Sequence, residues 1–300
     1  MRLLTLALTI VSAFHLMCCS IKHDFESNFV YPDPKPDTVA LPFLPGIVSS
    51  DSLDFNAAFS PDGKLFYFAR SFNGNWQIYQ TAFDGKNWSS PSFAPFSERQ
   101  YSMADPFITS DGSVYFISNR PRNERDTLPD FDIWVVHHQE NGQWSAPENI
   151  QEVNSDSTEY YVSLAANSNL YFASNRSGGY GSHDIYVSKF VNGKYTTPVN
   201  LGANINSAEM EHDPLILNDE RCIIFTSVNR EGGLGEADFH YATRENADQP
   251  WSSALNLGKQ FNTPTYEYCP NLTPDSKFFF YSSEYDVKWI ATKNLPFKLE

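Results

Sequence analysis

The chain is poor in cysteine, which limits how its fold can be held together. Only four of its 300 residues are cysteines, and two of these are adjacent, at positions 18 and 19. A disulfide-rich scaffold is therefore excluded. Cys222 and Cys269 remain. An exported protein permits a bridge between them, but they fall on separate strands of adjacent repeats, so we expect two small buried side chains instead.

Basic residues are also scarce, and long apolar runs are confined to the N-terminus. There are 21 Lys and Arg against 36 Asp and Glu, a formal net charge of −15. Nucleic acid is therefore not an expected partner, because polyanions need a basic face. After residue 20 no apolar run approaches the roughly 18 residues needed to span a bilayer.

The first 19 residues have the features of an export signal. Arg2 precedes an apolar stretch from residue 3 to 16, and the following Leu-Met-Cys-Cys resembles a bacterial lipobox. We predict a lipoprotein signal peptide over 1–19, with Cys19 lipidated and a Pro-containing tether over 20–40. Lipidation of Cys18, or an ordinary secretory signal, is the alternative.

What the chain has in abundance is a repeated pattern of short strands. The segment 159–207 contains four apolar strands separated by turns of Asn, Ser and Gly. Its plan recurs at intervals of about 50 residues, with repeats starting near 54, 103, 159, 211 and 267. Four short strands per repeat at this spacing are typical of a β-propeller blade. The sequence predicts an all-β fold, a single five-bladed β-propeller over residues 41–300.

The fifth repeat lacks a fourth strand before the chain ends. Residues 41–47 resemble residues 199–205, which form the fourth strand of the third repeat. We therefore predict that this N-terminal strand completes the last blade and removes an open sheet edge.

Polar residues recur where each inner strand begins. Because the inner strand of a propeller lines the axis, we expect these residues around one mouth of the channel. One register holds Asp54, Glu159, Glu211 and Glu267, and a second holds Asn56, Asp105, Tyr161, Asp213 and Cys269. The ligand-binding candidates are Asp105, Glu159, Tyr161, Glu211, Asp213 and Glu267. A structural calcium ion is compatible with these oxygen ligands. The competing interpretation is structural: each acid accepts N–H bonds within its own blade.

A second recurring pattern joins an arginine after the second strand to an aspartate at the start of the third. The three pairs are Arg120 with Asp132, Arg176 with Asp184, and Arg230 with Asp238. We predict salt bridges that brace the intervening loops. The corresponding loop of the second repeat, residues 121–131, is longer and charged, and is the best candidate for a distinctive recognition element.

The repeat motifs resemble a known family. Ser-Pro-Asp-Gly-Lys-Leu-Phe-Tyr-Phe (60–68), Ser-Asn-Arg (118–120 and 174–176), Asp-Ile-Tyr (184–186) and Pro-Val-Asn-Leu-Gly (198–202) are similar to the WD-40-like repeats of the periplasmic propeller protein of the Tol system. The resemblance implies a propeller in the periplasm or at the outer membrane of a Gram-negative bacterium.

Two classes of function follow as expectations. The first is a non-enzymatic, lipid-anchored monomer that binds an envelope protein or a glycan and needs no cofactor. The alternative is a glycan-active enzyme with carboxylates at the central channel, for which Asp54, Asp105 and Glu159 are the candidates.

Overall fold

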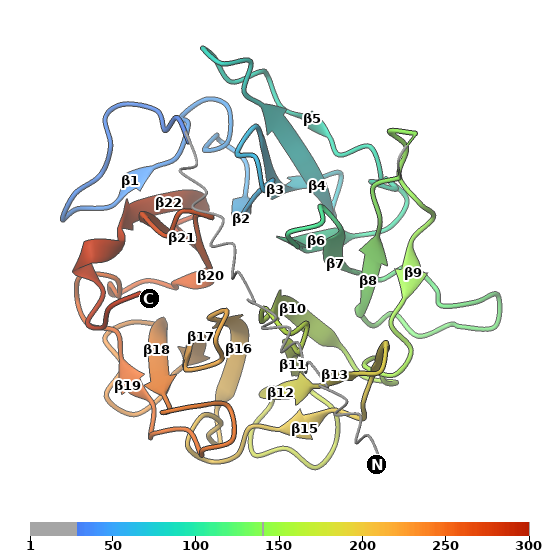
Figure 1. The fold of residues 1–300 in the computed structure, drawn as a ribbon, viewed down its shortest axis with the longest axis vertical. Coiled ribbons are helices and arrows are strands. Elements are labelled where there is room, and N and C mark those ends of the chain that lie inside the picture. Colours follow the sequence, from blue (N-terminus) through green and yellow to red (C-terminus); the bar gives the residue numbers. More distant parts are fainter. Residues whose placement is uncertain (1–28, 140, 300) are drawn as a thin grey trace, which may run out of the picture.

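The fold is a ring of five four-stranded antiparallel sheets around a central axis (Figure 1). A computed structural model describes residues 29–139 and 141–299 of the chain. The predicted all-β, five-bladed propeller is confirmed. The signal-peptide and lipidation predictions, Cys19 included, lie outside the described residues.

Each of the first four blades takes its strands from one continuous segment. Blade one comprises β2 (Asp54–Phe59), β3 (Leu65–Phe72), β4 (Asn75–Ala82) and β5 (Ser92–Phe93). Blade two comprises β6 (Met103–Ile108), β7 (Val114–Ser118), β8 (Asp132–Val136) and β9 (Glu148–Asn149). Blade three comprises β10 (Glu159–Leu164), β11 (Leu170–Ser174), β12 (Asp184–Ser188) and β15 (Val199–Asn200), with a small hairpin of β13 (Phe190–Val191) and β14 (Lys194–Tyr195). Blade four comprises β16 (Met210–Ile216), β17 (Cys222–Val228), β18 (Ala237–Thr243) and β19 (Leu255–Asn256).

Blade five combines strands from both ends of the described chain. Its first three strands are β20 (Tyr268–Leu272), β21 (Phe278–Ser283) and β22 (Asp286–Ala291), and a short 3-10 helix, Thr292–Asn294, follows. The outer strand is β1 (Leu41–Pro42), which pairs antiparallel with β22 so that Leu41 faces Trp289. Phe43, directly after β1, is fully buried against Phe280 and Trp289.

The ring extends further toward the N-terminus than the predicted tether allows. Tyr31 is buried, packs on Phe278 and Trp289, and donates a hydrogen bond to Asp275. Phe29 stacks beside it. The prediction of a tether through residue 40 is therefore wrong for residues 29–31, because these aromatic side chains bury apolar surface against blade five.

Second strands form the packed layer between blades. The equivalent positions, one per blade, are all buried aromatics: Phe68, Phe116, Phe172, Phe225 and Tyr281. Fourth strands are only two residues long, and those of blades one to three begin directly after Pro91, Pro147 and Pro198. Proline suits this edge because it has no N–H to donate.

Two further sequence predictions can be compared with the fold. Cys222 and Cys269 are both free and buried, as the interpretation of two small buried side chains requires. Among the described residues, no helix has the length and apolar character needed to cross a membrane.

Candidate functional site: the two mouths of the channel

Every inner strand carries a bulge at the same point. The pairing of inner and second strands shifts register there in all five blades. The residues at the shift all have positive φ: Asn56, Asp105, Tyr161, Asp213 and Cys269. Asn and Asp tolerate this left-handed conformation, whereas for Tyr it is strained. The second sequence register is thus the bulge position of the propeller.

The bulge side chains link one blade to the next. Asn56 and Asp105 bond reciprocally: the Asn56 amide donates to Asp105 Oδ1 (2.9 Å), and the Asp105 N–H donates to Asn56 Oδ1 (3.1 Å). Asp105 Oδ2 accepts the N–H of Tyr161 (3.2 Å), and Asp213 Oδ2 accepts that of Cys269 (2.8 Å). We call these five residues the axial ring. Asn56, Asp105 and Asp213 each accept the N–H group of the bulge residue in the next blade.

Asp105 and Asp213 are the two carboxylates of the axial ring. Burial raises the pKa of Asp105 to about 7, and the nearby Asp213 carboxylate adds to the effect. Asp213 also contacts His212 Nδ1 at 2.9 Å. A carboxyl that changes protonation near neutral pH can donate or accept a proton, so Asp105 is the chemically versatile member of the axial ring.

Aromatic side chains surround the mouth at which the inner strands begin. An unbroken series of ring contacts, with centroids 5.4 to 6.2 Å apart, draws on all five blades. Its members, in order, are His212, Tyr266, Tyr268, Phe55, Trp76, Phe131, Tyr160 and His183. We call this series the aromatic collar. It adjoins the axial ring at His212, which contacts Asp213 and bonds to the Tyr266 hydroxyl.

The first register of acids lies elsewhere, inside the blades. Glu159 is fully buried and accepts bonds from the Ser155 N–H (3.0 Å), the Ser155 and Ser174 hydroxyls, and Arg176 (2.8 Å). Glu211 and Glu267 are held in the same way by Ser207 and Thr263, and Asp54 by Ser50. These side chains are braces within single blades. Their contacts agree with the structural interpretation, and ligand binding by Glu159, Glu211 and Glu267 stays a prediction.

The predicted arginine–aspartate pairs are wrong in their partners. Arg176 pairs with Glu159 rather than Asp184, and Arg230 lies 3.6 Å from Glu211 rather than beside Asp238. In blade one, Arg70 pairs likewise with Asp54. The arginine reaches the inner-strand acid because that acid pairs across the ladder with the end of the second strand.

The third-strand aspartates take different donors. Asp184 accepts hydrogen bonds from two backbone N–H groups of the glycine loop, those of Tyr180 and Gly181. Asp238 accepts the N–H of Leu234 in the same manner. In blade two, Arg120 forms an ion pair with Glu98 at 2.7 Å, and Asp132 forms one with Arg122 at 3.4 Å.

The structure separates the three residues predicted for an enzyme. Asp54 and Glu159 belong to the braces of blades one and three, and only Asp105 lies in the axial ring. Since each brace acid is enclosed by its own blade, these acids do not form a calcium site. In residues 29–139 and 141–299, no three His, Cys, Asp or Glu side chains gather as metal ligands would.

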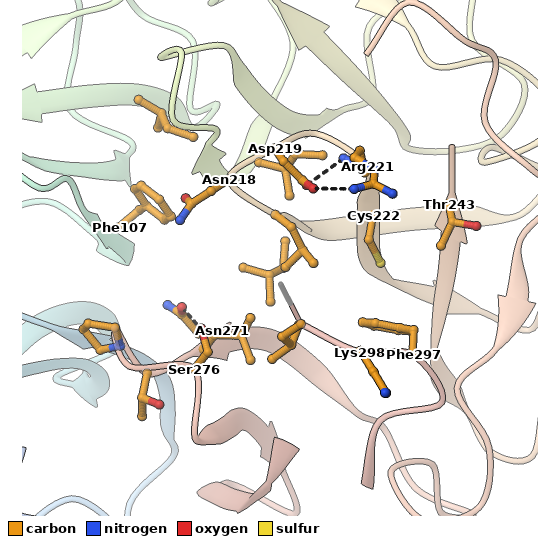
Figure 2. Close-up of a pocket in the computed structure, with 18 of the residues that line it drawn as sticks. Phe107, Asn218, Asp219, Arg221, Cys222, Thr243, Asn271, Ser276, Phe297 and Lys298 are labelled. Carbon is orange, nitrogen blue, oxygen red and sulfur yellow. Dashed lines mark hydrogen bonds and ion pairs between the residues drawn. The ribbon is translucent and has the colours of Figure 1, made fainter. Parts of the chain in front are cut away.

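The opposite mouth, where the inner strands end, opens into a cavity of about 1220 Å³ that the sequence did not reveal (Figure 2). Phe107, Leu164, Leu215 and Leu272 give it apolar walls from four blades. Charged side chains lie toward one side, where Figure 2 shows Asp219 beside Arg221 and Lys298 beside Phe297. We call this the wide cavity. Its walls come from residues at the ends of separate strands, so only the closed ring brings them together.

Comparisons with known proteins identify the fold alone. No protein-family model matches the chain, and a search of curated proteins gave no match. A TolB-like protein from Agrobacterium tumefaciens is 16% identical, with a TM-score of 0.50 over 78% of this chain and 71% of that one. A thermostable family-43 glycoside hydrolase is 11% identical, with a TM-score of 0.51 over 87% and 91% of the two chains. An α-L-arabinofuranosidase from Lactobacillus brevis is 13% identical, with a TM-score of 0.51 over 90% and 94%. The chain thus shares a propeller fold with both a TolB-like protein and glycoside hydrolases.

Proposed function

We propose that this protein is a non-enzymatic, lipid-anchored binding module of the bacterial cell envelope that takes a segment of a protein partner into its wide cavity. The observation that carries this proposal is the cavity itself, a hollow of about 1220 Å³ with apolar walls and charged side chains toward one side. The predicted N-terminal signal supports the proposed envelope location, and the similarity of fold to a TolB-like protein agrees with it.

The composition of the cavity favours a peptide over a glycan. Its volume exceeds the roughly 300–1,000 Å³ of most small-molecule sites. Phe107 and Leu272, from blades two and five, are partly exposed and contribute apolar surface to its walls. Apolar anchors that enter such a hollow supply much of the free energy of protein association.

A charged substitution in the wall tests the proposal. Phe107→Glu places a carboxylate on the apolar surface of the wide cavity, and Val199→Glu is the matched control because Val199 is exposed on the outer edge of blade three. Each chain is cross-linked in envelope extracts and recovered by pulldown. The wild-type chain and the Val199 variant should retain the same envelope protein, and the Phe107 variant should lose it. A melting temperature for each variant verifies folding. Retention of that protein by the Phe107 variant would exclude the wide cavity as the site.

A second candidate function, hydrolysis of glycans, is favoured by the axial ring. Asp105 and Asp213 differ in surroundings, and Asp105 has a pKa of about 7, as a general acid requires. The catalytic pair would then be Asp105 and Asp213. Of the three residues expected from the sequence, Asp105 would remain, and Asp54 and Glu159 would not take part. Aryl glycosides provide the assay. Turnover that both Asp105→Asn and Asp213→Asn abolish, with folding intact, would establish an enzyme, and no turnover by the wild-type chain would exclude this candidate for those substrates.

A further inference from the structure

The wide cavity is bordered on one side by the segment that follows the 3-10 helix. Phe297, Lys298 and Leu299 line the cavity, and Figure 2 shows Phe297 and Lys298 together at one side of it. The segment consists of residues 296–299 and follows the buried Leu295. We call residues 296–299 the strap. Neither candidate function gives the strap a role.

Apolar side chains alternate with exposed ones along the strap. Phe297 and Leu299 are half-buried, whereas Pro296 and Lys298 are exposed. Phe297 and Leu299 pack against an apolar cluster of blades four and five, and this cluster includes Leu215, which lines the wide cavity. The strap therefore covers part of the apolar surface beside the cavity, and it does so with every second residue.

Side-chain contacts alone hold the strap in place. The Leu295 N–H donates to the carbonyl oxygen of Thr292 at 2.9 Å, which completes the 3-10 helix. Beyond Leu295, the strap makes no hydrogen bond with residues 29–139 or 141–299. Phe297 packs on the ring of Tyr241, with centroids 5.0 Å apart. A segment without hydrogen bonds detaches at the cost of its packing contacts only, so we expect the strap to open while the blades stay folded.

Other segments at this mouth are fastened by hydrogen bonds. In the 3-10 helix before the strap, the Asn294 side-chain amide donates to the carbonyl oxygen of Asp37 at 2.6 Å. Phe29 also lines the wide cavity, and Tyr31, which stacks beside it, donates a hydrogen bond of 2.7 Å to Asp275. The strap has no equivalent bond to the described part of the chain, which sets it apart from both segments.

We propose that the strap is an autoinhibitory element of the wide cavity, and that a partner segment with apolar side chains at alternate positions displaces it. This inference rests on the proposed function, because it concerns the regulation of the same cavity. The strap itself shows the pattern that fits this wall, with Phe297 and Leu299 turned inward and the exposed Lys298 between them.

Tethering makes the strap a filter for partners. A short linker holds a tethered segment beside its site at an effective concentration on the order of 1 mM. Peptides that bind the wall more weakly than this do not displace the strap, whereas a partner segment that binds more tightly does. The strap also keeps apolar surface covered in the free chain, where it would otherwise promote association.

The sequence of the strap supplies the probe. The peptide acetyl-Pro-Phe-Lys-Leu-amide has the sequence of residues 296–299, and NMR titration measures its binding to the full chain. The double variant Phe297→Ser/Leu299→Ser removes the apolar contacts of the strap, so it should bind the peptide at least tenfold more tightly than the wild-type chain does. Pro296→Ser/Lys298→Ser is the matched control, because it changes only the exposed positions, and it should bind as the wild-type chain does.

The wild-type chain gives a second readout that misfolding cannot imitate. When the peptide is added to saturation, the methyl resonances of Leu299 should move to random-coil positions, whereas those of Leu295 should not, because Leu295 stays in the core. The inference is overturned if the Phe297/Leu299 double variant, with its melting temperature verifying folding, binds the peptide no more tightly than the wild-type chain. It is also overturned if Leu299 stays in place while the peptide is bound.

Failure of this inference is distinguishable from failure of the proposed function. The peptide titration needs no envelope partner, so a strap that does not regulate peptide binding leaves the capture of an envelope protein unaffected. Phe107→Glu in the background of the double variant should abolish peptide binding, because Phe107 belongs to the wall of the same cavity. Unchanged binding by that triple variant would place the peptide elsewhere and would contradict the strap as an element of the wide cavity.

Discussion

The hydroxyl of Tyr161 donates a hydrogen bond of 2.6 Å to the carbonyl oxygen of Pro270. Tyr161 belongs to blade three and Pro270 to blade five, and these blades are not neighbours in a ring of five. The side chain must therefore extend across the axis. Tyr161 reaches that position from a strained backbone with φ of 43°. The hydrogen bond therefore ties together two blades that do not neighbour each other.

Removal of this hydroxyl should destabilise the ring. Tyr161→Phe leaves the buried carbonyl of Pro270 without its donor, and we expect a loss of about 1–3 kcal/mol in the free energy of unfolding. Urea denaturation measures it. Tyr180→Phe is the control, because Tyr180 is 54% exposed, and it should change little. An unchanged stability for the Tyr161 variant would show that the cross-axis bond contributes nothing.

The fold could be predicted from the sequence because its signals are local. Turn residues, alternating apolar strands and a spacing of about 50 residues define each blade without reference to any other blade. The side-chain partners could not be assigned in this way. Arg176 and Asp184 are close in sequence and match in charge, but the register of the ladder places Arg176 next to Glu159.

The candidate site was predictable only in part, for the same reason. The sequence placed Asp105, Tyr161 and Asp213 at one repeated position, and the structure has all three at the bulge of an inner strand, whereas their predicted ligand binding stays a prediction. The wide cavity depends on strand ends from four blades, so it leaves no motif in the sequence.

The Glu159–Arg176 brace should show strong coupling. Either Glu159→Gln or Arg176→Met leaves one buried partner unpaired, at a cost of about 3–5 kcal/mol. The double variant should cost clearly less than the sum of the single changes, because it leaves no unpaired charge. A double-mutant cycle in guanidinium chloride measures this coupling. Additive effects would mean that the arginine does not stabilise the acid.

Stability should fall with rising pH through the titration of Asp105. The pKa of this residue is about 7 in the fold, because of burial first and the Asp213 carboxylate second, and 3.8 when unfolded. Between these values the folded state binds more protons than the unfolded state, so the contribution of Asp105 is full below 3.8 and lost by about 7. Asp105→Asn cannot titrate and should have a shallower decline in melting temperature from pH 4 to pH 7. Parallel curves for the two chains would contradict the raised pKa.

Replacing either of two glycines with alanine should destabilise the fold, for a different physical reason in each case. Gly181 has ordinary φ, but a Cβ there would overlap the carbonyl oxygen of Glu209, the same oxygen that accepts the Ser182 N–H. Gly193 has φ of +79° and open space around it, so alanine there meets only the left-handed backbone penalty. We expect Gly193→Ala to cost about 1–2 kcal/mol. Gly181→Ala should cost more, because backbone atoms of two blades would have to move apart. Thermal melting ranks the two variants. If Gly181→Ala were the milder change, close contact between blades three and four would not be the reason for glycine at that position.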